Sequence, residues 1–152
     1  MYINAFAFKN YGPDSNLTLT GFEVYMGLTD NVNLSTVYED NYLPGTRTLV
    51  LQKDSILYTA EPEEWCIIQL DTPFLYEAEH HLLLEFLFTG GSSNMHNYVW
   101  STTTDRVVMG YNPAGTSGTH RNNMIHLLLT GNALNLDPTT FGAIKIILGN
   151  PE

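Results

Sequence analysis

Apolar and polar residues alternate in short runs along this chain, and this alternation constrains the fold more than any other feature of the sequence. In residues 81–88, one parity is wholly apolar: Leu82, Leu84, Phe86 and Phe88. A period of two residues places such side chains on one face of a β-strand. Gly, Pro, Asn and Asp interrupt the runs, as they do at turns between strands. The pattern predicts an all-β fold, specifically an antiparallel two-sheet sandwich of jelly-roll type.

Strands are expected wherever such a run lies between turn residues. The predicted strands cover residues 2–8, 17–26, 48–52, 56–59, 64–70, 81–88, 98–101, 106–111, 123–130 and 139–148. Residues 53–55 would join the third and fourth of these as a hairpin, and residues 71–73 would end the fifth. The parity of the apolar residues flips beside Gly21, which predicts a β-bulge near Thr20 and Gly21.

The length of 152 residues suits one domain, so we expect a single β-sandwich domain over residues 1–152. Within it, residues 131–152 would form a C-terminal extension strand. One face of that strand would carry Ile144, Ile146 and Leu148, with Lys145 on the other. Because an apolar face of this size favours burial, the strand is expected either to fold back or to enter a neighbouring copy of the chain.

The net charge of −10 comes from 16 acidic and 6 basic residues. Such a surface repels phosphate backbones and anionic lipid headgroups, so we expect no nucleic-acid partner. No apolar run approaches the roughly 18 residues of a membrane-spanning helix, so we also expect no membrane insertion. The single cysteine, Cys66, excludes an internal disulfide and is interpreted as a small buried apolar residue.

Several hydrophobic landmarks resemble those of a known family. They read GFEVYMG at residues 21–27, TLV at 48–50, W at 65, TPF at 72–74, Y at 76, LLLEF at 82–86 and RNN at 121–123. This run resembles the jelly-roll β-sandwich domains of large secreted bacterial surface proteins, which are adhesin-like and associated with type IX secretion. The resemblance covers roughly residues 3–130 and implies a fold and an extracellular or cell-surface location, with no catalytic residues to carry over.

This chain departs from the family at both ends. Members have one or two further strands before the segment that matches residues 2–8, and they end near the segment that matches residues 123–130. Where members have asparagine before the apolar strand, this chain has His81.

The residue spacings match no catalytic or metal-binding motif, so we expect neither enzymatic activity nor a cofactor. The histidines lack zinc-site spacing, and no G-x-S-x-G nucleophile elbow occurs. A site assembled from separate loops, such as His96 with His120, is the alternative to ordinary strand and loop histidines. His126 is interpreted as a strand-face residue because it alternates with Met124 and Leu128.

Two groups of residues are candidate binding sites. Asp30, Asn31 and Asn33 offer loop oxygen atoms to a structural calcium ion, as the alternative to an ordinary Asx turn. A ligand-binding cluster is predicted from residues 94–100: Asn94, His96, Tyr98 and Trp100. Tyr98 and Trp100 share one strand parity, and exposed aromatic rings of this kind stack on sugars. The competing interpretation places Trp100 in the core.

These observations favour a non-catalytic extracellular surface module for adhesion, recognition or spacing. Two alternatives are a self-assembling filament subunit completed by strand exchange and a carbohydrate-binding module. The expected partners are accordingly other surface proteins, copies of this chain or glycans.

Overall fold

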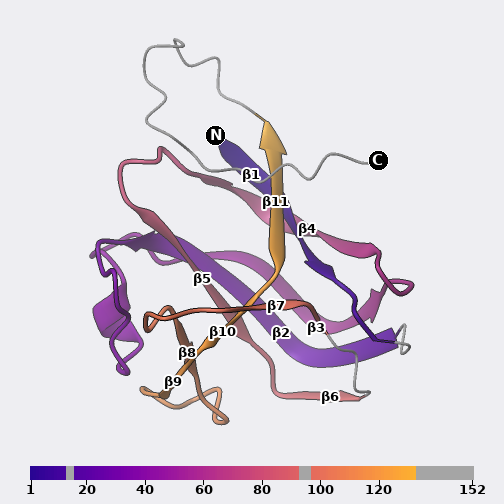
Figure 1. The fold of residues 1–152 in the computed structure, drawn as a ribbon. Coiled ribbons are helices and arrows are strands. Elements are labelled where there is room, and N and C mark those ends of the chain that lie inside the picture. The colour runs from indigo at the N-terminus through magenta and orange to yellow at the C-terminus, as the bar shows by residue number, and fades with distance from the viewer. Residues whose placement is uncertain (13–15, 93–96, 133–152) are drawn as a thin grey trace.

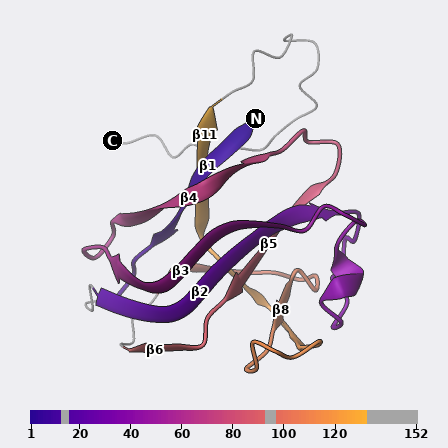
Figure 2. The same ribbon diagram turned by 180° about the vertical axis from the view of Figure 1, so that it is seen from behind.

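The computed structural model describes residues 1–12, 16–92 and 97–132, and these residues form an all-β fold (Figures 1 and 2). The strands are β1 (Tyr2–Lys9), β2 (Asn16–Thr29), β3 (Thr48–Thr59), β4 (Trp65–Leu75), β5 (His81–Leu87), β6 (Gly90–Ser92), β7 (Val99–Ser101), β8 (Val107–Met109), β9 (Thr119–Arg121), β10 (Asn123–Ile125) and β11 (Leu127–Asn132). One short 3₁₀ helix, η1 (Glu39–Asn41), lies in the connection from β2 to β3. The predicted all-β class is therefore confirmed.

The strands form two larger antiparallel sheets and two ribbons. One sheet has the order β11-β1-β4, and the other has the order β3-β2-β5, with β6 also paired to β2. We call these the β1 sheet and the β2 sheet. The ribbons are β7–β10 and β8–β9. In both views the ribbon β8–β9 lies at the end of the molecule away from the N-terminus (Figures 1 and 2).

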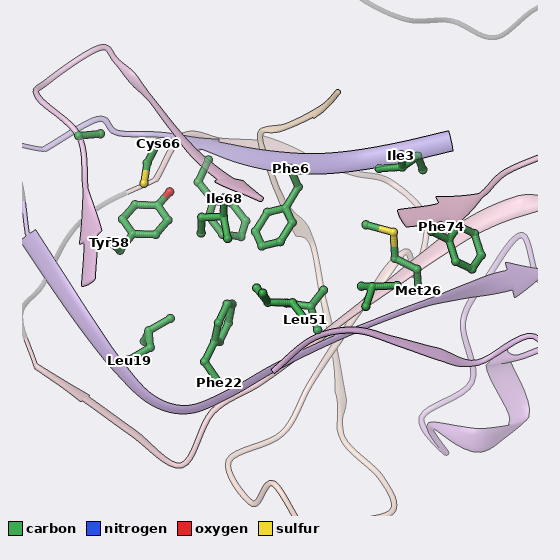
Figure 3. Packing of buried hydrophobic residues seen from close by; sticks show 14 residues of the cluster. Ile3, Phe6, Leu19, Phe22, Met26, Leu51, Tyr58, Cys66, Ile68 and Phe74 are labelled. Atoms are coloured by element: carbon green, nitrogen blue, oxygen red, sulfur yellow. The ribbon is translucent and has the colours of Figure 1, made fainter. Parts of the chain in front are cut away.

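The hydrophobic core is built from side chains of both larger sheets. Phe6 of β1 lies 5.4 Å from the ring of Phe86 on β5, measured between ring centroids. Phe8 lies 5.3 Å from Phe86 and 5.4 Å from Tyr58 of β3. Figure 3 shows Phe6 and Phe22 pointing toward one another between β1 and β2. Aromatic packing of this kind joins the two sheets through their inward faces.

The strand predicted at residues 81–88 is confirmed as β5, with one correction. Leu84 and Phe86 pack against the core as predicted, although both stay partly exposed. Phe88 was expected on the same face, but β5 ends at Leu87 and Phe88 is 49% exposed. The alternation therefore extends one residue further in the sequence than the strand does in the structure.

The predicted hairpin at residues 48–59 is wrong, because β3 is one continuous strand. It pairs with β2 from Thr48 to Thr59. The polar residues that suggested a turn lie at the edge of the β2 sheet, where their side chains are exposed to solvent. Lys53 forms an ion pair with Asp71 of β4, and the backbone N–H of Gln52 donates to the same carboxylate. An exposed edge strand tolerates such residues and is protected by their charge.

Two further boundaries differ from the prediction. Strand β4 continues through Pro73 to Leu75, and its pairing with β1 shifts register between Ile3 and Ala5. Proline is accepted there because β4 is an edge strand. The inward face of β2 switches parity beside Gly21 as predicted, and Gly21 takes φ +56°. The register shift between β2 and β3 lies instead between Val24 and Tyr25.

Cys66 is buried, as predicted, and burial raises the pKa of its thiol. The strand predicted at residues 139–148, with Ile144, Ile146 and Leu148, lies outside the described residues. Among the described residues, no helix is long and apolar enough to cross a membrane.

Candidate functional site

The strand predicted at residues 123–130 is interrupted at His126, where the chain passes from a ribbon to a sheet. Before this residue, β10 pairs with β7, and after it, β11 pairs with β1. The backbone N–H of His126 donates to the carbonyl oxygen of Tyr98 at 2.8 Å. His126 therefore sits at a junction, and its interpretation as an ordinary strand-face residue is wrong.

Aromatic rings from two separate segments surround the His126 imidazole. The centroid of the His126 ring lies 5.0 Å from Trp100, 5.5 Å from Trp65 and 6.3 Å from Tyr98. Tyr11 extends the group, with its ring 5.2 Å from Tyr98 in an edge-to-face arrangement. We call these five residues the aromatic cluster.

The outer members of the aromatic cluster are open to solvent. Tyr11 is 62% exposed and Trp100 is 47% exposed, so the interpretation of Trp100 as a core residue is wrong. Trp65, Tyr98 and His126 are half-buried. Large aromatic side chains contribute most to folding when they are buried. A group of them held at the surface is a typical feature of a binding site.

Hydrogen-bonding groups border the aromatic cluster on the side of Tyr98. The Tyr98 hydroxyl donates a hydrogen bond to the Glu63 carboxylate. Lys9 Nζ lies 3.3 Å from Glu63 Oε2 and 5.0 Å from the centre of the Tyr98 ring. The hydrogen bond from Tyr98, and then the one from Lys9, lower the pKa of Glu63, while the carboxylate raises the pKa of the Tyr98 hydroxyl.

Asn10 holds the turn that presents Glu63. This side chain is fully buried at the end of β1, and its Nδ2 donates to the carbonyl oxygen of Ala60 at 2.9 Å. The Asn10 backbone pairs with the same turn, accepting from Glu63 N at 3.0 Å and donating to Glu64 O at 2.9 Å. A buried polar side chain satisfied in this way fixes the turn to the core.

The predicted ligand-binding cluster is described only in part. Tyr98 and Trp100 lie together in the aromatic cluster, and Asn94 and His96 lie outside the described residues. A site formed by His96 and His120 is likewise not described. His120 Nε2 lies 2.8 Å from the carbonyl oxygen of Leu34, and its Nδ1 lies 3.7 Å from Asp105.

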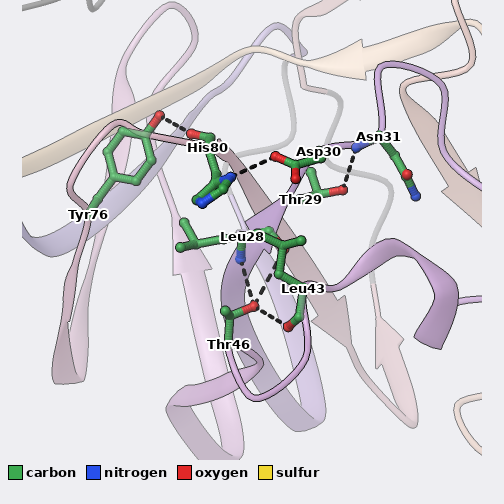
Figure 4. Close-up of polar contacts among 8 residues, drawn as sticks. All are labelled: Leu28, Thr29, Asp30, Asn31, Leu43, Thr46, Tyr76 and His80. Atoms are coloured by element: carbon green, nitrogen blue, oxygen red, sulfur yellow. Dashed lines mark hydrogen bonds and ion pairs between the residues drawn. The ribbon is translucent and has the colours of Figure 1, made fainter.

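Asp30 and Asn31 of the predicted calcium site contact protein groups (Figure 4). Asp30 Oδ1 lies 2.6 Å from His80 Nδ1, and the backbone N–H of Asn31 donates to the Thr29 hydroxyl at 3.0 Å. Asn33 is exposed. In the part of the chain that the structure describes, no group of three or more His, Cys, Asp and Glu side chains is placed to hold a metal ion.

A second polar network covers the outer side of the β2 sheet. Arg47 forms two hydrogen bonds with Glu85, at 2.9 and 3.2 Å, and lies 3.7 Å from the centre of the Tyr25 ring. Tyr42 donates to the same carboxylate at 2.6 Å. The groups of this network are directed at one another, which is typical of a structural ion pair.

Sequence reasoning found Tyr98 and Trp100 but missed five residues that the fold brings to them: Lys9, Tyr11, Glu63, Trp65 and His126. These residues come from β1, the segment after it, the turn before β4, the start of β4 and the junction between β10 and β11. Local alternation carries no signal for contacts between such distant segments. No protein-family model, curated protein or solved structure shows a significant match to this chain.

Proposed function

We propose that this chain is a non-catalytic recognition module that binds glycans outside the cell through the aromatic cluster. The proposed architecture is a jelly-roll sandwich formed by the β1 and β2 sheets. The observation that carries the function is the exposure of Tyr11 and Trp100 in a group of aromatic rings. The resemblance to domains of secreted surface proteins supports the extracellular location.

The chemistry of the aromatic cluster suits a sugar. A pyranose ring presents C–H groups on its faces, which pack on aromatic rings, and hydroxyls at its edge, which need hydrogen-bonding partners. Tyr11 and Trp100 offer the rings, and Glu63 and Lys9 offer an acceptor and a donor beside them. The lowered pKa of Glu63 suits an ionised acceptor, whereas a general acid for glycoside hydrolysis needs a raised pKa.

A screen of immobilised glycans followed by calorimetry tests this proposal. Trp100→Ala and Tyr11→Ala should each weaken the binding of any glycan found by about tenfold or more, equivalent to about 1.4 kcal/mol. Tyr111→Ala is the matched control, because Tyr111 is 85% exposed and belongs to no part of the aromatic cluster. Failure of the wild-type chain to bind any glycan, or equal losses in all three variants, would contradict the proposal.

A second candidate function is self-assembly by strand exchange, with copies of this chain as partners. It is favoured by two exposed apolar side chains, Leu57 on β3 and Ile67 on β4, which line an open groove of about 440 Å³ between these edge strands. Edge strands are templates for further strands. Sedimentation across a concentration series tests it: assembly that disappears when residues 142–152 are deleted would support exchange, and a monomer throughout would exclude it.

A further inference from the structure

Glu63 has a backbone conformation that its side chain disfavours. Its φ is +70°, in the left-handed region where a Cβ atom clashes with the backbone. Ala78, with φ +63°, is the other non-glycine residue with positive φ among the described residues. Glycine would adopt either conformation without this cost. A residue that keeps a side chain at such a position makes the side chain itself a candidate for a function.

The Glu63 carboxylate is aimed at the aromatic cluster yet remains open to solvent. Tyr98 donates to Oε1, and Lys9 approaches Oε2 at 3.3 Å. The side chain is 59% exposed. An ionised carboxylate has about four lone-pair sites, so these two contacts leave capacity for further donors. The carboxylate is thus oriented by Tyr98 and Lys9 and can accept hydrogen bonds from a molecule resting on the aromatic rings.

The charge around this position favours an uncharged ligand. The adjacent turn residues Glu61 and Glu64 are exposed, and the whole chain carries a net charge of −10. Lys9, the cation beside Glu63, is already paired with that carboxylate. A sugar carboxylate or sulfate placed at the aromatic cluster would face like charge, whereas sugar hydroxyls would find an acceptor.

Resting on the proposed glycan-binding function, we propose that Glu63 contacts the ligand and determines its class: it accepts hydrogen bonds from the hydroxyls of neutral glycans and rejects acidic ones. A residue that served only in a structural ion pair or in a turn would not affect which glycans bind. Because glycine adopts the backbone conformation of Glu63 more readily, a substitution by glycine can remove the side chain without destabilising the fold, so its effect on binding can be measured separately from stability.

Calorimetry with defined oligosaccharides tests this inference. The probes are three neutral hexasaccharides, cellohexaose, mannohexaose and xylohexaose, and one acidic hexasaccharide, a hexauronate. The wild-type chain should bind at least one neutral probe about tenfold or more tightly than the hexauronate. Glu63→Gln, which removes the charge and keeps an acceptor, should reduce this preference at least about fivefold.

Glu63→Gly separates a ligand contact from a structural role. It should weaken binding of the neutral probe about tenfold, the loss expected for one hydrogen-bonded contact, while its unfolding midpoint stays unchanged or rises. Ala78→Gly is the matched control, since it relieves the same backbone conformation and should bind as the wild type does. Wild-type affinity in Glu63→Gly, or equal wild-type affinity for neutral and acidic probes, would overturn the inference. If Trp100→Ala still weakens binding in that case, the proposed function stands and only the role of Glu63 fails; if the wild type binds neither these probes nor any glycan of the screen, both fail.

Discussion

The buried centre between β1 and β2 and the surface ribbon β7–β10 are made of similar residues in very different environments. Phe6 and Val24 are fully buried, whereas Val99 and Trp100 are about half exposed. In the ribbon, Trp100 pairs with Met124, and Val99 pairs with Ile125 on the opposite face. Both faces of the ribbon therefore carry exposed apolar side chains.

The difference shows that alternation of apolar residues predicts a strand but does not predict whether another part of the protein buries that strand's apolar face. A strand in a larger sheet gains a facing sheet, as β1 does through Phe6 and Phe86. A two-stranded ribbon of short strands gains no such cover and is of marginal stability alone. The ribbon is attached to the β1 sheet through the junction at His126. Because this attachment does not require its exposed side chains to be buried, they can contact a ligand.

The largest expected effect that would sharpen this comparison comes from the buried side. Phe6→Ala should lower the free energy of unfolding by about 3–5 kcal/mol, because it removes a fully buried ring and leaves a cavity. Urea denaturation followed by circular dichroism measures the loss. Val99→Ala is the control in the ribbon and should cost well below half as much; equal losses would show that the two regions are packed alike.

A smaller loss is expected where the core meets the turn of Glu63. Asn10→Ala removes the donor to Ala60 and the acceptor for the Gly12 N–H, both in buried surroundings. Leaving such groups unpaired should cost about 1–3 kcal/mol. The same variant should also weaken glycan binding, since Asn10 fixes the turn. An unchanged midpoint of urea unfolding would mean that the turn keeps its structure without the Asn10 side chain.

The ribbon side should show a change in binding with little change in stability. Trp100→Ala is expected to lower the free energy of unfolding by no more than about 1 kcal/mol, because the side chain is about half exposed. The measurement is again urea denaturation. A loss as large as that of Phe6→Ala would contradict the comparison and make Trp100 a core residue after all.

The smallest effect is the acid dependence of a surface pair. The hydrogen bond from Lys53, and then that from the Gln52 backbone, lower the pKa of Asp71. A lowered pKa in the folded state means a contribution to stability that is present above the unfolded pKa of about 3.9 and lost as the pH falls through the folded value. Asp71→Asn should therefore flatten the loss of stability below about pH 4. If the free energy of unfolding of Asp71→Asn fell with pH as it does in the wild type, the acid dependence of stability would come from groups other than Asp71.

The sequence predicts the strands best where each has one buried face. Strands β1 and β5 lie close to their predicted ranges because their apolar residues alternate against the core. Strand β3 was predicted as two strands because Lys53 and its polar neighbours resemble a turn. At an edge these residues face solvent and pair with Asp71, a contact that no local pattern announces.

The candidate site was predictable only where its residues are neighbours in the sequence. Tyr98 and Trp100 share a parity and were found. Glu63 comes from a distant segment, and Asn10 bonds the turn of Glu63 to the end of β1. Tyr11 follows that same end of β1 and contacts Tyr98. Such pairing depends on tertiary contacts over about 35 positions or more, which alternation does not encode.

Intrinsic tryptophan fluorescence tests the central claim most directly. The chain has 2 tryptophans, and both Trp65 and Trp100 contact His126 within the aromatic cluster. Titration with the neutral hexasaccharide that binds should therefore change the emission in a saturable way, with an affinity matching calorimetry, and Trp100→Phe should remove most of that change. A glycan that binds by calorimetry and leaves tryptophan emission unaltered at saturation would show that the aromatic cluster is not the binding site.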